Sequence, residues 1–227
     1  MKSLVSLEKK IPQCRKCSRL VRYLAEIKAK FPTYWCRPVP GFGDPNAQIL
    51  LIGLAPGRFG SNRTGRMFTG DASGNFLYPV LHKVGLATKP VATDLHDGLK
   101  LKNTFITAVA RCAPPQNKPK PQEIKNCRPY LEKELKLLSS LRVVVALGKI
   151  AHDEYLRIRV REEGKRLSDF PFRHGVIYHF RKKPKILIDT YHPSRQNTNT
   201  GKLTKAMFLK IFKQAARLAS DQTPPLR

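Results

Sequence analysis

The sequence predicts an α/β fold, a three-layer α/β/α sandwich around a central, mainly parallel four-stranded sheet. Four short aliphatic segments indicate the strands: 48–52, 103–109, 141–147 and 185–191. Because they lack polar alternation, we expect them to be buried on both faces. Helical patterns separate them, and this alternation is typical of parallel sheets. No internal repeat or linker interrupts the chain, so a single domain is expected over residues 1–227.

The remaining elements follow from apolar spacing and from breakers. Leu20, Leu24, Ile27 and Phe31 share one helical face, within a cysteine-containing segment (12–31) expected to pack on the core. Prolines are expected to kink or restart two helices, at Pro79 and Pro129. Three further helices are expected over 73–84, from Pro121 onward, and in a short segment ending at Tyr155. A basic irregular segment (160–175), an edge strand (176–180) and a polar loop (195–201) follow. The last expected element is an amphipathic helix (203–219) with Leu203, Met207, Ile211, Ala215 and Leu218 inward.

Charge separates this chain from most globular proteins. It has 43 Lys and Arg against 16 Asp and Glu, a formal net charge of +27 over 227 residues. Most of the basic groups cannot be paired within the chain, so a polyanionic partner is expected, with nucleic acid ahead of an anionic membrane. No apolar run approaches a membrane span or a signal peptide. We therefore expect a cytoplasmic, nucleoid-associated monomer without a membrane partner, and leave a sliding-clamp partner open.

The stretch from Ile52 to Leu77 organises the chain. It leaves a buried strand into a loop whose glycines, Gly53, Gly57 and Gly60, allow backbone groups to approach a ligand closely. The stretch holds three arginines but a single acid, Asp71. A carboxylate among guanidinium groups is expected to stay ionised, which suggests catalysis. The competing interpretation is structural, with Asp71 or Ser73 capping the following helix.

Four of the five cysteines are arranged as a candidate metal site. Cys14 and Cys17 are separated by two residues, and Cys112 and Cys127 come from distant chain. Such a set can close a four-thiolate site for zinc or an iron–sulfur cluster, which spacing alone does not separate. Neighbouring arginines and lysines are expected to lower the thiol pKa values. The alternative is four unrelated cysteines, and Cys36 is interpreted as a plain loop thiol.

Several motifs, in order, resemble the uracil-DNA glycosylase superfamily, in particular its type b branch (family 5), known mainly from thermophilic archaea and bacteria. The motifs are GLAPG, TGRMFTGDASGNFL, the later cysteines and YHPSRQNTNTGKLT. The resemblance runs from Cys14 to about Lys205. It implies a four-stranded parallel sheet and a structural [4Fe–4S] cluster on Cys14, Cys17, Cys112 and Cys127. It also implies excision of uracil, and in this branch hypoxanthine or xanthine, from double- or single-stranded DNA.

The same resemblance implies roles for individual residues. The catalytic set would be Asp71, His192 and Asn117, and Phe68 would stack on the flipped base. Other residues expected to contact substrate are Gly53, Leu54, Ala55, Pro56, Gly57 and Ser194, and those expected to contact DNA are Arg63, Arg66, Arg195, Gln196 and Asn197. Leu54 stands where family 4 enzymes have Glu, and Ala108 where they have Asn, so we expect a looser choice of base.

The chemistry of such a reaction agrees with these residue types. Breaking an N-glycosidic bond develops positive charge on the sugar and negative charge on the base, which a carboxylate and a hydrogen-bond donor would stabilise. A non-catalytic nucleic-acid-binding protein with a four-cysteine metal site is the alternative, but it leaves Asp71 and His192 without a role. A phosphate-cradling nucleotide enzyme is disfavoured, because the glycine loop matches neither GxxxxGK[ST] nor GxGxxG.

Overall fold

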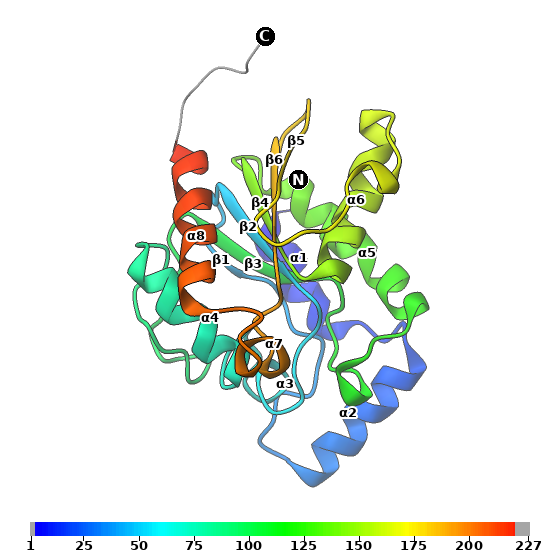
Figure 1. Ribbon diagram of the computed structural model, residues 1–227. Helices are drawn as coiled ribbons and strands as arrows, with labels where there is room; N and C mark the ends of the chain where they lie inside the picture. Colours follow the sequence, from blue (N-terminus) through cyan, green and yellow to red (C-terminus); the bar gives the residue numbers. More distant parts are fainter. Residues whose placement is uncertain (1–2, 221–227) are drawn as a thin grey trace.

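The computed structural model describes residues 3–220 and contains one mixed sheet (Figure 1). In these residues the sheet order is β1 (Phe42–Gly43), β3 (Thr104–Ala108), β2 (Ile49–Gly53), β4 (Val143–Leu147), β6 (Ile186–Thr190) and β5 (Ile177–His179). The four inner strands pair in parallel, and the two edge strands are antiparallel. The predicted parallel four-stranded core is confirmed, and so is an edge strand within 176–180.

Alternate residues of the inner strands face opposite layers of helix, which makes the three-layer sandwich. The helices are α4 (Ala72–Lys83) and α8 (Lys205–Ser220) on one face, and α5 (Pro121–Leu137) and α6 (Lys149–Glu163) on the other (Figure 1). Leu51 and Val145 belong to the core on the α4 and α8 side, whereas Leu50 and Val144 belong to the core on the α5 side. Because both faces are covered, these strands are apolar throughout.

The N-terminal segment packs on the α5 side of the molecule. It consists of α1 (Leu4–Lys10), a 3₁₀ turn (Ile11–Gln13) and α2 (Ser18–Lys30). Leu20 and Leu24 are buried in a small cluster with Cys112. Phe31 lies just beyond the end of α2 and stacks on Tyr34, with ring centroids 4.7 Å apart. The predicted inner face of the helix is therefore correct up to Ile27.

Two helices continue through prolines that were expected to kink or restart them. Pro79 lies inside α4 and Pro129 inside α5, and both helices are unbroken. A proline costs a helix one hydrogen bond and creates a local clash. Here each helix buries residues on both sides of its proline, such as Tyr78 and Val80 in α4, so packing outweighs that cost.

Four elements beyond β4 differ, wholly or in part, from the prediction. Helix α6 extends past Tyr155 to Glu163, and a 3₁₀ turn (Leu167–Asp169) follows within the segment expected to be irregular. The expected polar loop begins as a short helix, α7 (Arg195–Asn199). Ile211 and Ala215 of α8 are buried as predicted, and so is Leu203 just before the helix. Phe208 and Phe212 are also buried, whereas Met207 and Leu218 are only partly so.

The carboxyl ends of the parallel strands meet at one edge of the sheet. Short α3 (Ser61–Thr64) and α7 lie at this edge, at the lower end of the molecule in Figure 1. In parallel α/β sheets this edge is where ligands bind. Within residues 3–220, no helix combines the length and apolar character needed to cross a membrane.

Candidate active site at the carboxyl edge of the sheet

An aromatic ring lies directly against the end of β2. A Cβ added to Gly53 would lie 2.9 Å from the Phe68 ring, so only glycine allows this contact. Phe68 has a left-handed backbone (φ +54°), and its N–H donates to Ser61 Oγ at 2.9 Å. Its ring centroid is 6.0 Å from that of His192. The ring is thus a fixed, mostly buried wall between two strand ends.

His192 follows β6 and is held by two neighbours. Gly148 follows β4 with φ +97°, and a Cβ there would lie 3.2 Å from His192 Cβ. The Asn197 side-chain amide donates to the His192 carbonyl oxygen at 2.9 Å. Burial lowers the pKa of His192 to about 4, because the charged imidazolium is poorly solvated there. At neutral pH the ring is therefore an uncharged donor and acceptor.

Asp71 caps a helix, as the structural interpretation expected, and one of its carboxylate oxygens is left free of that cap. It is the N-cap of α4, and its Oδ1 accepts the Gly74 N–H at 2.9 Å. Its Oδ2 faces the glycine loop, where added Cβ atoms at Gly57 and Gly60 would press against it. One oxygen is therefore fixed by the helix, while the other is turned toward the loop that leaves β2.

Burial dominates the electrostatics of Asp71. Burial raises the pKa of the carboxyl above its ordinary value. The backbone N–H groups of Gly74 and Ser73 and the positive charges of Arg195 and Arg63 lower the pKa, but by less. We expected the arginines to determine the charge state, but their effect is smaller than that of burial. An ionised Asp71 is thus poorly solvated, which favours an active base.

The other residues expected to contact substrate lie around these groups. Leu54 is partly buried against the core on the α5 side, Pro56 is buried, and Ala55 and Gly57 are half-exposed. Ser194 is the N-cap of α7 and accepts from Asn197 N–H. Ala108 is buried at the end of β3, in register with Gly53, and belongs to the same apolar cluster as Phe68.

Asn117 is not joined to this group. It lies in an exposed 3₁₀ turn (Pro115–Asn117), and both Gln116 and Asn117 have left-handed backbones. Within residues 3–220, no hydrogen bond links its side chain to Asp71, Phe68 or His192. The catalytic role of Asn117 stays a prediction.

The five residues expected to contact DNA differ in how exposed they are and in what they bind within the protein. Arg195 and Gln196 are exposed on α7. Arg63 is half-buried and donates to the Phe59 carbonyl oxygen at 2.9 Å. The prediction is wrong for Arg66, which is 2% exposed and donates to both carboxylate oxygens of Asp97, with Nη1–Oδ1 at 2.9 Å. Asn197 mainly supports His192, as described above.

Cys14, Cys17, Cys112 and Cys127 line one cavity beside Arg111 and Tyr130. Burial raises the pKa values of Cys112 and Cys127, which corrects the expectation that nearby cations lower them. Cys36 lies elsewhere, 3.6 Å from the side-chain amide of Asn62. Among residues 3–220, no three Cys, His, Asp or Glu side chains are arranged to hold a single metal ion.

Three residues that shape the site were not singled out from the sequence: Ser61, Gly74 and Gly148. Ser61 fixes the Phe68 backbone, and Gly148 makes room for His192. Gly74 lets α4 lie against the Phe68 carbonyl group. Their signal is weak in sequence, because it consists of glycines whose neighbours come from distant parts of the chain.

Comparison with known proteins identifies the family to which this chain belongs. The family model described as "Uracil DNA glycosylase superfamily" matches residues 40–216, and the chain therefore belongs to this superfamily. Within it, the chain is 53% identical to a type-5 uracil-DNA glycosylase of Thermus thermophilus over 211 residues, covering 91% of this chain and 94% of that one. A type-5 relative from Mycobacterium tuberculosis is 44% identical, over 96% of this chain and 82% of that one.

A relative from the neighbouring group is more distant. The type-4 uracil-DNA glycosylase of Sulfurisphaera tokodaii is 28% identical over 93% of this chain and 84% of that one. These similarities agree with the type b resemblance that the motifs indicated.

Replacing Arg66 with methionine should lower stability without affecting DNA binding directly. Burial acts to raise the pKa of Asp97, but hydrogen bonds from Arg66 and from backbone N–H groups outweigh it and hold the pKa low. This stabilisation is present above the unfolded pKa and is lost as pH falls through the folded one. Breaking a buried pair costs about 3–5 kcal/mol, measurable by denaturant unfolding at pH 7.

The matched control is Arg195→Met, which changes an exposed arginine. It should leave stability nearly unchanged and reduce the slope of log K against log[salt] for DNA binding, by about 0.9 for one lost phosphate contact. If Arg66→Met were stable and reduced the slope of log K against log[salt], Arg66 would have to contact DNA after all.

Proposed function

We propose that this protein removes uracil from DNA by hydrolysing the N-glycosidic bond, leaving an abasic site. Membership of the superfamily supports a DNA N-glycosylase. The observation that carries the proposal is the placement of a partly buried carboxylate, Asp71, at the edge where Phe68 and a neutral His192 also lie. The non-catalytic alternative would not require a poorly solvated acid at this position.

Asp71 would act on the sugar side of the bond. Its Oδ1 is held by the α4 N-terminus, so the orientation of Oδ2 is fixed before substrate arrives. Oδ2 would orient a water molecule and stabilise positive charge on the sugar as the bond breaks. A second acid is not required, because the departing base is a tolerable anion, unlike the alkoxide that leaves in O-glycoside hydrolysis.

Phe68 and His192 would act on the base. The everted base would stack on the Phe68 ring, and the neutral His192 would donate a hydrogen bond to the base O2 as negative charge develops there. Gly53 and Gly148 support this arrangement, because larger residues would displace the two rings. Outside the pocket, Arg195 and Gln196 on α7 would contact the DNA.

We propose that the base choice extends to hypoxanthine and xanthine. The support is the apolar end of β3, where Ala108 is buried beside Phe68 and offers no side-chain hydrogen bond. A pocket without a fixed polar partner for one base rejects related bases weakly.

We also propose that Cys14, Cys17, Cys112 and Cys127 hold a structural [4Fe–4S] cluster. Four thiols facing one cavity form a suitable donor set. Four thiolates also suit a tetrahedral zinc ion, so analysis of the bound metal separates the two groups. When bound, the cluster would cross-link the α2 segment to α5 and to the loop after β3.

Asp71→Asn is expected to fold normally but lose excision. Asparagine retains the N-cap, and removing a charge that burial disfavours should raise stability at neutral pH. Uracil release should fall by about 10²- to 10⁴-fold, and hypoxanthine release from the same duplex should fall in parallel.

Single-turnover release from uracil- and hypoxanthine-containing duplexes measures both activities, with thermal unfolding as the control for folding. Unchanged release by Asp71→Asn would rule out Asp71 as the catalytic carboxylate. Release of uracil alone by the wild type would refute the wider base choice.

The pH dependence of excision should show loss of activity only on the acid side. Activity requires ionised Asp71, whose pKa is raised by burial, and neutral His192, whose pKa is lowered to about 4. Single-turnover rates should therefore be level from about pH 6 to 8, and should fall as pH drops through a value above that of an ordinary aspartate. A rate that declines as pH rises from 6 to 8 would instead indicate a catalytic imidazolium.

Cys112→Ser should remove the metal cluster and destabilise the protein. The purified wild type should contain about four iron and four sulfide per chain, and the variant little of either. Metal and sulfide analysis with thermal unfolding measures this, and Cys36→Ser serves as the matched control because Cys36 lies outside the cavity. Stoichiometric zinc in the wild type, or full iron loading of Cys112→Ser, would contradict the proposal.

A further inference from the structure

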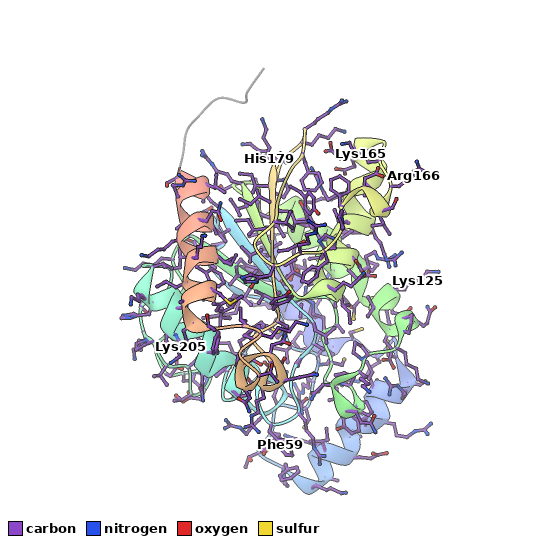
Figure 2. The ribbon with its side chains drawn as sticks, viewed as in Figure 1. Phe59, Lys125, Lys165, Arg166, His179 and Lys205 are labelled. Carbon is purple, nitrogen blue, oxygen red and sulfur yellow. The ribbon has the colours of Figure 1, made fainter. Side chains whose placement is uncertain are left out.

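An exposed aromatic side chain lies near the active site but outside it. Phe59, in the loop between β2 and α3, is 56% exposed and points out of the lower end of the molecule (Figure 2). The Arg58 guanidinium carbon lies 4.9 Å from the centre of its ring. Phe31 meets the same ring edge-on, with centroids 6.3 Å apart. We call Phe31, Arg58 and Phe59 the loop platform.

The backbone that carries the loop platform is well fixed. Arg63 Nε donates to the Phe59 carbonyl oxygen at 2.9 Å, and the Asn62 N–H donates to the Gly57 carbonyl oxygen at 3.0 Å. The next residue, Gly60, is the glycine that lies against Asp71. The loop platform is thus joined to the catalytic carboxylate through a single neighbouring residue.

The loop platform cannot be part of the base pocket already described. Phe68 is 7% exposed and lies between Gly53 and His192, whereas Phe59 faces solvent. The stretch from Gly53 to Asp71 therefore carries two aromatic rings, one inside the pocket and one outside it. The outer ring carries a guanidinium, and the chain as a whole has a net charge of +27. An aromatic face beside a cation is the usual means of binding unpaired bases of a polyanionic strand.

We infer that the loop platform stacks on a second nucleobase, an unpaired base of the DNA outside the pocket that takes the everted base. Arg58, which covers part of the Phe59 ring, is near enough to contact the adjoining phosphate backbone. This inference rests on the proposed function only in taking DNA as the ligand. It adds a site that favours strands whose bases are already unstacked.

Binding of two single-stranded probes of equal length and charge tests the inference. One probe is an oligothymidylate, and the other is the same backbone made of abasic residues. Phe59→Ala should weaken binding of the thymine probe by about 5- to 150-fold, the equivalent of about 1–3 kcal/mol for one stacked base. Binding of the abasic probe should hardly change, because its charge contacts remain.

Three further variants make the result specific to the aromatic ring. Phe59→Leu keeps an apolar side chain without a ring and should behave as the alanine variant does, whereas Phe59→Trp should retain binding. Val5→Ala changes an apolar residue of similar exposure (59%) on α1 and should leave both affinities unchanged. Thermal unfolding checks that each variant is folded. If Phe59→Ala does not fold, Phe59→Leu is used in its place.

Each alternative outcome contradicts the inference. Equal losses for the two probes would mean contacts to the backbone only, and no loss for either would mean that the exposed ring serves a different partner. Uracil release by the wild type is measured separately. A wild type that releases no uracil would refute the proposed glycosylase without affecting the stacking result. Conversely, a negative stacking result would leave the proposed glycosylase unaffected.

Discussion

The structure depends on keeping one carboxylate in a poorly solvated place. Asp71 is buried enough for its pKa to rise, yet it is held by backbone N–H groups at the start of α4 and faces two arginines. The helix terminus supplies a partial positive charge and fixed donors without bringing water. Gly57 and Gly60 permit the close approach that excludes solvent from the other side. A charged group is thereby positioned before any substrate binds.

The sheet explains how distant parts of the chain reach this carboxylate. Parallel pairing of β3, β2, β4 and β6 brings four strand ends to one edge, so Gly53, Gly148 and His192 become neighbours. Apolar burial on both faces makes those strands rigid. The loops at that edge can then differ in chemistry without altering the core.

Much of the fold could be predicted because its signals are local. Continuous aliphatic strands and glycine-rich ends indicated the parallel core, and a lone acid among arginines and glycines indicated Asp71. Phe68 and His192 were indicated by the family resemblance. What failed depended on distant partners. Nothing near Arg66 in sequence shows that Asp97, 31 residues away, will pair with it. Likewise, a five-residue helix such as α7 has too few residues to show apolar periodicity. Asn117 was assigned by resemblance alone, and its exposed turn adds no local support.

Titration of Asp71 itself tests the central claim most directly. Carboxyl ¹³C resonances of the free protein, with Asp71→Asn used to assign the signal, would give its pKa without dependence on turnover. If the carboxylate is held in a desolvated place, the measured pKa lies clearly above the roughly 3.9 of an ordinary aspartate. A value at or below the ordinary one would mean that Asp71 is a well-stabilised helix cap, and that the catalytic carboxylate of this site has not been found.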